Sequence, residues 1–261
     1  MFPTKENLQL FRTMVLRDIK AKYQGTLLGF LWNLVTPLVM LAIYSTVFLT
    51  VFKARWNLSA SEQADYGLML FVGILTHTYM AEVLTTTSTV IRNNSNLVKK
   101  VRFPVPMLPM VSVCSAGVNY FFGLILAFSY GAFNHYVSDY SALIYFPLVL
   151  VTYLCTLSAI AYLVAALGVY IKDVSQVMPV LITVLLFTST VFFSAQSAPE
   201  KLANLLYFNP ISSIADAMRS ILYGQTPNFK HLLTLLSFSL ICWGGTYQFF
   251  SRLRPSFSDA L

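Results

Sequence analysis

The chain has 261 residues, of which 57% are hydrophobic and only 10% are charged. A soluble domain carries about 25% charged residues, so this composition argues strongly against a water-soluble fold. The formal net charge of +7 does not indicate nucleic-acid binding, because the basic residues lie in short segments beside apolar runs, where membrane topology accounts for them.

The first 26 residues predict an amphipathic helix. Apolar side chains recur at spacings of three and four residues, and basic side chains occupy the other faces. The apolar set is Leu8, Phe11, Val15 and Ile19, and the basic set is Arg12, Arg17, Lys20 and Lys22. Such a helix lies in the membrane surface, although a soluble helix packed on a partner would show the same pattern. Residues 1–26 lack the apolar core and cleavage site of a secretory signal peptide.

Six apolar runs of membrane-spanning length follow along the chain. They are residues 27–52, 66–91, 107–133, 143–171, 174–193 and 232–250. Basic residues gather before the first run, in the loop 92–104, and after the fourth and sixth runs. Because basic flanks stay in the cytoplasm, this distribution predicts an even number of spans with both termini cytoplasmic.

Residues 194–231 are too polar to cross the membrane and too apolar to form a free loop. Ser197 is suited to cap a short helix that starts with the following residues. The pair Asn209-Pro210 ends that helix, and a second amphipathic piece runs over residues 211–223. We expect two short helices that lie on the outer leaflet or dip into it.

Glu82 is the one acidic residue inside an apolar run. An ionised group at that depth is costly and is usually functional. The bland explanations are hydrogen bonding to Thr85 or Thr86, or access to water near the cytoplasmic end of the run. Because a single carboxylate makes a poor proton relay, we expect a structural or gating role for Glu82.

Catalytic and cofactor chemistry finds little support in the sequence. No glycine is followed by lysine, so the chain lacks the phosphate-binding loop of ATP hydrolysis. The three histidines lie in different segments and form no zinc-protease motif. We expect no metal or cofactor in this chain, and an ATP-driven process would need ATP and Mg²⁺ on another subunit.

Aromatic residues make up 15% of the chain. The candidates for a channel wall are Trp32, Tyr44, Phe48 and Phe187. Ring faces inside a pore stack on the C–H faces of sugars while letting a chain slide. Rings that face lipid or pack in the protein are the alternative for each one, and rings such as that of Trp32 concentrate at membrane interfaces in any case.

Several sequence motifs then follow one another in the order of a known family. Residues 17–32 read RDIKAKYQGTLLGFLW and are followed by Thr36-Pro37-Leu38, and residues 96–104 read NLVKKVRFP and are followed by Leu108-Pro109. Asp173-Val174, Pro199-Glu200, Asn209-Pro210 and Arg219 continue the series. This order resembles the ABC-2 type permeases, and most of all those that export O-antigen and related polysaccharides.

The resemblance implies an all-α polytopic membrane protein with six transmembrane helices, in which residues 1–261 form a single ABC-2 transmembrane domain. It implies a homodimer in the bacterial inner membrane, beside two copies of a separate ABC ATPase subunit that binds ATP and Mg²⁺. An undecaprenyl-linked glycan would pass through a channel between the protomers. An ABC-2 exporter of capsule, teichoic acid, a drug or another lipid stays open as the alternative, and neither a membrane-bound glycan enzyme nor a proton-coupled carrier is favoured.

The resemblance also assigns roles to three segments. The interfacial helix in residues 1–26 and the cytoplasmic loop 92–104 would meet the ATPase, and short helices within 194–231 would gate the outer side. The expected ATPase-coupling residues are Arg17, Lys20, Asn96, Lys99, Lys100 and Arg102. The expected channel or gate residues are Trp32, Tyr44, Phe48, Glu82, Phe187, Asn209 and Arg219. The basic residues of the loop would also suit anionic membrane lipids or a lipid pyrophosphate.

Overall fold

A computed structural model of the chain describes residues 5–47, 55–59, 62–99, 103–136, 139–194 and 205–261. The main helices are α1 (Lys5–Tyr23), α2 (Trp32–Thr46), α3 (Tyr66–Asn93), α5 (Met107–Phe133), α6 (Phe146–Tyr170), α7 (Val174–Phe187), α9 (Pro210–Leu222) and α10 (Phe229–Leu253). Shorter helical pieces are η1 (Gly29–Leu31), α4 (Ser95–Val98), η3 (Tyr140–Tyr145), η5 (Arg254–Ser256) and α11 (Phe257–Ala260). The prediction of a helical membrane protein is confirmed.

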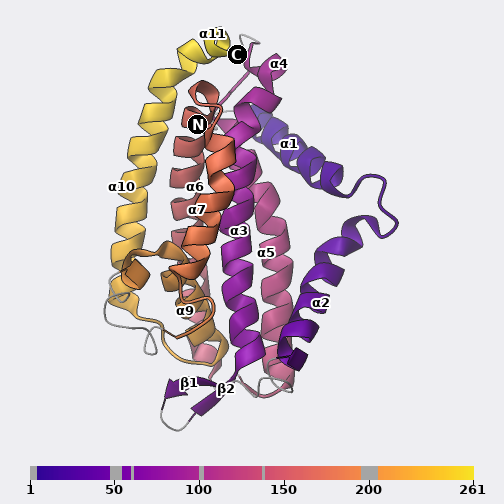
Figure 1. Cartoon of the computed structure of the whole chain (residues 1–261), viewed down its shortest axis with the longest axis vertical. Helices are drawn as coiled ribbons and strands as arrows, with labels where there is room; N and C mark the ends of the chain where they lie inside the picture. Colours follow the sequence, from indigo (N-terminus) through magenta and orange to yellow (C-terminus); the bar gives the residue numbers. More distant parts are fainter. Residues whose placement is uncertain (1–4, 48–54, 60–61, 100–102, 137–138, 195–204) are drawn as a thin grey trace.

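One small sheet interrupts this helical pattern. Strand β1 (Arg55–Ser59) pairs antiparallel with β2 (Glu62–Asp65), and the hairpin precedes α3. Figure 1 places the hairpin and α9 at one end of the bundle, and the C-terminus with α4 and α11 at the other end. We call these the hairpin end and the terminal end.

Helix α3 forms the centre of the bundle. Of its best apolar window, 72% is buried, and α3 packs against α2, α5, α6, α7 and α9. Tyrosines from three helices meet at its middle, where Tyr79 stacks on Tyr120 at 5.0 Å and Tyr153 meets both edge-on. The hydroxyl of Tyr79 donates to the carbonyl of Val113, so α3 and α5 are joined by a hydrogen bond as well as by ring contact.

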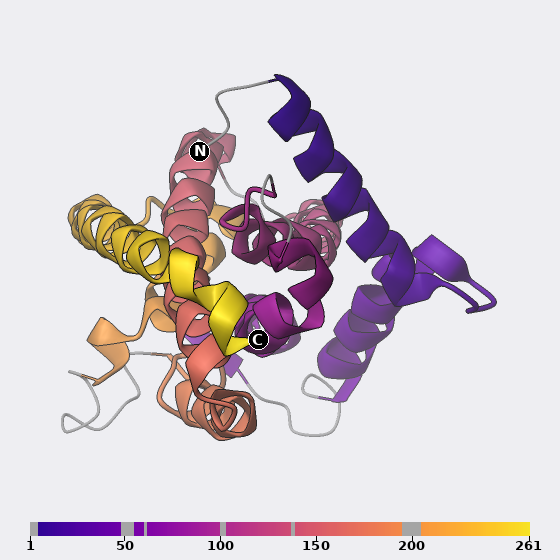
Figure 2. The same cartoon turned by 90° about the horizontal axis from the view of Figure 1, so that it is seen from above.

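Helices α2 and α10 stand on opposite sides of the bundle and bury little of their apolar surface (Figure 2). Only 17% of the apolar window that contains α2 is buried, and only 11% of the apolar window in the segment that contains α10 is buried. A helix that is apolar on its exposed face is expected where lipid or another helix replaces water.

In the part of the chain that the structure describes, five helical segments are long and apolar enough to cross a membrane: Gly29–Thr46, Tyr66–Asn93, Met107–Phe133, Tyr140–Tyr170 and Phe229–Ala260. The predicted span 174–193 is shorter than expected, because α7 ends at Phe187. Its 14 residues rise about 21 Å, against roughly 30 Å of hydrocarbon. The chain leaves the helix after Phe187, and the carbonyls of Thr190 and Val191 accept hydrogen bonds from Arg219 instead of from an α-helix.

The first predicted span is also shorter at its start. Gly25 and Gly29 both have positive φ, at +81° and +52°, a conformation that costs glycine little. The chain turns there between α1 and η1, so the helical segment begins at Gly29 instead of at residue 27. The predicted end of this span lies outside the described residues.

A substitution at Gly168 of α6 tests how closely α6 packs on α3. A Cβ added to Gly168 would collide with the backbone carbonyl of Ser88. We expect Gly168→Ala to lower the free energy of unfolding by about 1–3 kcal/mol, the usual effect of overpacking a well-packed core.

Gly244→Ala in α10 is the matched control, since nothing lies within 4 Å of a Cβ at that position. Thermal unfolding of both detergent-solubilised variants measures the difference. A Gly168→Ala protein that unfolds at the temperature of Gly244→Ala would contradict the close α3–α6 contact.

Candidate functional site

The terminal end gathers distant parts of the chain around one buried cluster. Met14 of α1, Val98 of α4 and Phe257 of α11 pack together with residues from the ends of α3, α6 and α10. Phe257 is 0% exposed, and α11 packs against α4 and α6. The interfacial helix, the short loop helix and the last helix therefore share one core.

The predicted coupling residues lie on the surface around this cluster. Arg17, Lys20, Asn96 and Lys99 are all exposed, on α1 and on α4 with the residue that follows it. Lys100 and Arg102 lie outside the described residues. The predicted apolar face of α1 is partly buried, because Phe11 and Val15 pack on the terminal cluster while Leu8 stays exposed.

A polar latch ties the end of α1 to the bundle. Lys22 pairs with the carboxylate of Glu82 at 2.5 Å, across 60 positions of sequence. The next residue, Tyr23, donates to the side-chain oxygen of Asn33 at 2.6 Å and lies 3.3 Å from that of Asn119. The latch therefore connects α1, α2, α3 and α5.

Glu82 thus has a partner that the sequence pattern did not indicate. Thr86 hydrogen-bonds to the backbone carbonyl of Glu82, and Thr85 bonds to Ala81. Neither threonine has a hydrogen bond to the Glu82 carboxylate among the described contacts. Hydrogen bonding to these threonines, one of the alternative explanations for Glu82, does not account for its carboxylate among the described residues, because Lys22 reaches it from a different helix.

The predicted channel aromatics that the structure describes do not converge within one copy of the chain. Trp32 on α2 and Phe187 on α7 are 39% and 63% exposed, on helices that pack on different sides of α3. Tyr44 is half-buried and packs on the main core. Phe48 lies outside the described residues.

At the hairpin end, the side chain of Arg219 joins several segments of the chain. It is 2% exposed and projects from α9. Its Nε donates to the carbonyl of Met69 at 2.9 Å, Nη1 donates to the carbonyl of Thr190 at 2.7 Å, and Nη2 donates to that of Val191 at 3.1 Å. One guanidinium therefore fastens α9 to α3 and to the turn that follows α7.

Asp216 neutralises this buried cation. Its Oδ1 lies 2.9 Å from Nη1 of Arg219 and also accepts from Thr190 Oγ1 at 2.9 Å. Burial raises the pKa of the Asp216 carboxyl, and the charge of Arg219 opposes that rise. Burial lowers the pKa of Arg219, and Asp216 opposes it in turn. Gly73 makes room, since a Cβ there would collide with Nη2 of Arg219.

Asn209 joins the same network as a helix cap. Its Oδ1 accepts from the backbone N–H of Ile211 at 2.9 Å, which caps α9. Its Nδ2 donates to the carbonyls of Leu185 and Thr188 at 3.1 and 3.0 Å. Asn209 and Arg219, predicted together as gate residues, thus both hold α9 against the end of α7, from opposite ends of the short helix.

Asp65 was missed by the sequence reasoning. It caps α3 by accepting from Leu68 N, its backbone N–H donates to the hydroxyl of Tyr223, and Tyr130 donates to its Oδ2 at 3.1 Å. The available signal was an aspartate directly before a long apolar run, which is a helix-start pattern. The contacts to Tyr130 and Tyr223 had no local signal.

Replacing Arg219 by lysine tests whether the guanidinium geometry is required. A lysine keeps the charge but cannot serve three carbonyls and a carboxylate in one plane. We expect Arg219→Lys to lower the free energy of unfolding by about 3 kcal/mol, the lower end of the range for a broken buried pair. Exposed Arg252 in α10 gives the matched control Arg252→Lys, which should leave the unfolding temperature unchanged. Equal unfolding temperatures for the two variants would refute the proposed fastening.

Charge reversal tests the latch. Lys22→Glu alone and Glu82→Lys alone each place like charges together, and both should destabilise the protein. The double variant restores an opposite pair, and we expect a favourable coupling of about 1 kcal/mol in the double-mutant cycle. Additive losses in the double variant would show that the pair does not interact.

Comparison with known proteins identifies the family of this chain. The family model described as "ABC-2 type transporter" matches residues 9–223, which include most of α1 and all of α4, α7 and α9. An O-antigen export system permease protein RfbA of Myxococcus xanthus is 25% identical, over 97% of this chain and 95% of its own length.

Another relative carries the same printed name. An O-antigen export system permease protein RfbA of Klebsiella pneumoniae is 20% identical, over 94% of this chain and 92% of its own length. The family match covers well over half of the sequence and includes both ends of the helical bundle. The chain therefore belongs to the ABC-2 type transporter family.

Proposed function

We propose that this chain is the membrane subunit of an ATP-driven exporter that moves an O-antigen-type polysaccharide, linked to undecaprenyl, across the bacterial inner membrane. The observation that carries the proposal is the family match over residues 9–223. Its support is the helical architecture with five segments of spanning length. The relatives named O-antigen export permeases match over more than nine-tenths of both chains.

The energy for transport comes from a separate subunit in this proposal. The chain has no Gly-Lys pair for a phosphate-binding loop, so ATP and Mg²⁺ would bind to two copies of an ABC ATPase. The docking surface would be the exposed faces of α1 and α4 with Arg17, Lys20, Asn96 and Lys99. This surface is suited to receive force, because α1 and α4 pack on the same buried cluster as the ends of α3, α6 and α10.

The terminal end faces the cytoplasm in this proposal. The exposed residues Arg17, Lys20 and Lys99 lie there, as do Arg252 and Arg254 at the end of α10. Basic residues close to membrane spans are retained on the cytoplasmic side. The hairpin end and α9 would then face outward, where Asn209 and Arg219 hold the gate.

A second copy of the chain would complete the channel. Helices α2, α7 and α10 carry exposed large apolar side chains, and lipid or a second protomer would cover them. The rings of Trp32 and Phe187, which are separate in one protomer, would then contribute to a channel shared by two. Tyr44 of α2 packs on the main core and would support that wall.

Charge reversal at the terminal end tests the proposed docking. We expect Lys99→Glu combined with Lys20→Glu to abolish co-purification of the ATPase subunit and to remove polysaccharide from the cell surface, because an attractive basic surface becomes acidic.

Lys230→Glu gives a control with the same charge change at the start of α10, where Lys230 is also exposed. It should retain the ATPase. Retention of the ATPase by the Lys20/Lys99 variant, or its equal loss from the Lys230 variant, would contradict the assigned surface. Normal surface polysaccharide in a strain that lacks this chain would contradict the proposed function itself.

A further inference from the structure

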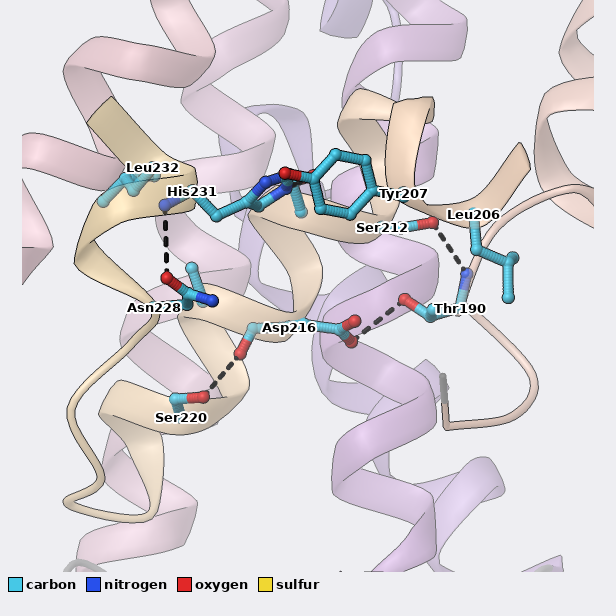
Figure 3. Close-up of a pocket in the computed structure, with 11 residues that line it drawn as sticks. Thr190, Leu206, Tyr207, Ser212, Asp216, Ser220, Asn228, His231 and Leu232 are labelled. Atoms are coloured by element: carbon cyan, nitrogen blue, oxygen red, sulfur yellow. Dashed lines mark hydrogen bonds between the residues drawn. The ribbon is translucent and has the colours of Figure 1, made fainter. Parts of the chain in front are cut away.

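A pocket of about 300 Å³ lies beside α9 at the hairpin end. Its walls come from α9, from the start of α10, from Thr190 after α7, and from Leu206 and Tyr207 before α9. Figure 3 shows the rings of Tyr207 and His231 along one side and the Asp216 side chain in the middle. The pocket shares Asp216 and Thr190 with the Arg219 network, and its other lining residues come from α9, from the start of α10 and from the segment before α9.

Asp216 offers one free carboxylate oxygen to this pocket. Its Oδ1 is occupied by Arg219 and Thr190. Its Oδ2 accepts no hydrogen bond from the part of the chain that the structure describes. The side chain is 41% exposed. Because Arg219 balances the charge, the free oxygen suits a neutral ligand with hydroxyl donors better than it suits a cation.

The aromatic side of the pocket carries further polar groups. The rings of Tyr207 and His231 lie 4.3 Å apart, and His231 Nε2 hydrogen-bonds with Ser213 Oγ at 2.7 Å. His231 Nδ1 is buried and has no hydrogen-bond partner among the described residues. A buried polar atom without a partner is costly. This Nδ1 has almost no accessible surface, so a ligand hydroxyl would reach it only after the His231 ring turns.

This combination matches the chemistry of a sugar ring. A pyranose presents several neutral hydroxyls that both donate and accept, and it has C–H faces that pack on aromatic rings. The pocket supplies a carboxylate oxygen, serine hydroxyls and an imidazole beside a tyrosine ring, and its volume accommodates one hexose. Ligand sites typically combine such an apolar wall with a few placed polar groups.

A neighbouring cavity is suited to an apolar ligand instead of a sugar. It measures about 460 Å³, shares Tyr207 and His231, and is otherwise lined largely by apolar side chains such as Leu235 and Phe238. Asp216 does not line it. An acyl chain would fit that cavity, whereas the carboxylate and serines are gathered in the first one.

We propose that the pocket formed by Tyr207, Ser213, Asp216 and His231 binds one saccharide unit of the exported glycan at the outer gate. This inference rests on the proposed function, because it takes the ligand to be the transported polymer. Asp216 would contact the sugar through Oδ2 while it holds Arg219 through Oδ1. The same carboxylate therefore joins the ligand to the fastening of α9.

The test is saturation-transfer NMR on the full chain in lipid nanodiscs. The probes are the methyl glycosides of mannose, galactose, rhamnose and N-acetylglucosamine, each measured alone against empty nanodiscs. We expect at least one glycoside to receive saturation. Tyr207→Ala and Ser213→Ala should each weaken its binding by about fivefold to tenfold, the effect of losing a ring contact or one neutral hydrogen bond.

Two variants separate sugar contact from general damage. Tyr207→Phe keeps the ring and should retain most of the binding, and Phe238→Ala in the neighbouring cavity should retain all of it. Absence of saturation for every glycoside, or an equal loss in Phe238→Ala, would overturn the inference. Phe238 is exposed on α10, so Phe238→Ala should unfold at the wild-type temperature.

Surface polysaccharide distinguishes this inference from the proposed function. If deletion of the chain abolishes surface polysaccharide but no glycoside binds, the pocket assignment falls and the exporter stands. If glycosides bind as expected but deletion leaves surface polysaccharide intact, the site stands as a saccharide site and its link to export falls.

Discussion

The hairpin end depends on the buried guanidinium of Arg219. Inside a bilayer, every backbone carbonyl that leaves a helix needs another partner. The chain leaves α7 after Phe187. Arg219 donates hydrogen bonds to two of the carbonyls that follow and to the carbonyl of Met69 in α3. An arginine is suited to this task because its planar fork presents several donors at once. The short α7 and the position of α9 are thus two results of one interaction.

Helix α3 carries this constraint to the other end of the molecule. It begins at Asp65, whose side chain caps it. The carbonyl of Met69 accepts a hydrogen bond from Arg219, and Gly73 leaves space for that side chain. Further along, Glu82 pairs with Lys22, and the helix ends in the terminal cluster. It is buried over most of its length. A displacement of α1 or α4 would therefore act on the same rigid helix that holds the gate helix α9.

Local patterns in the sequence predicted what local physics decides. The apolar runs predicted the long helices to within a few residues, and the amphipathic piece predicted over residues 211–223 corresponds to α9, which begins at Pro210. The order of family motifs placed Asn209 and Arg219 together. The pairing of Lys22 with Glu82, the contacts of Asp65 and the burial of Phe257 could not be predicted, since each joins segments that are far apart in sequence. Residues 55–59 alternate polar and apolar side chains as a strand does, but residues 62–65 do not, so the sequence signals only the first half of the hairpin.

The latch and the terminal cluster hold different parts of α1. The cluster fixes the middle of α1 through Met14 by apolar packing, which has no preferred direction. The latch fixes its end through Lys22 and Tyr23, where an ion pair and hydrogen bonds set both position and orientation. Directly after Tyr23 the chain turns through two glycines with positive φ into η1 and α2. A rotation of α1 about Met14 would therefore move Lys22 and Tyr23 against α3. The same motion would reach α2 through the turn, and the backbone freedom of the two glycines would set how much of it is transmitted.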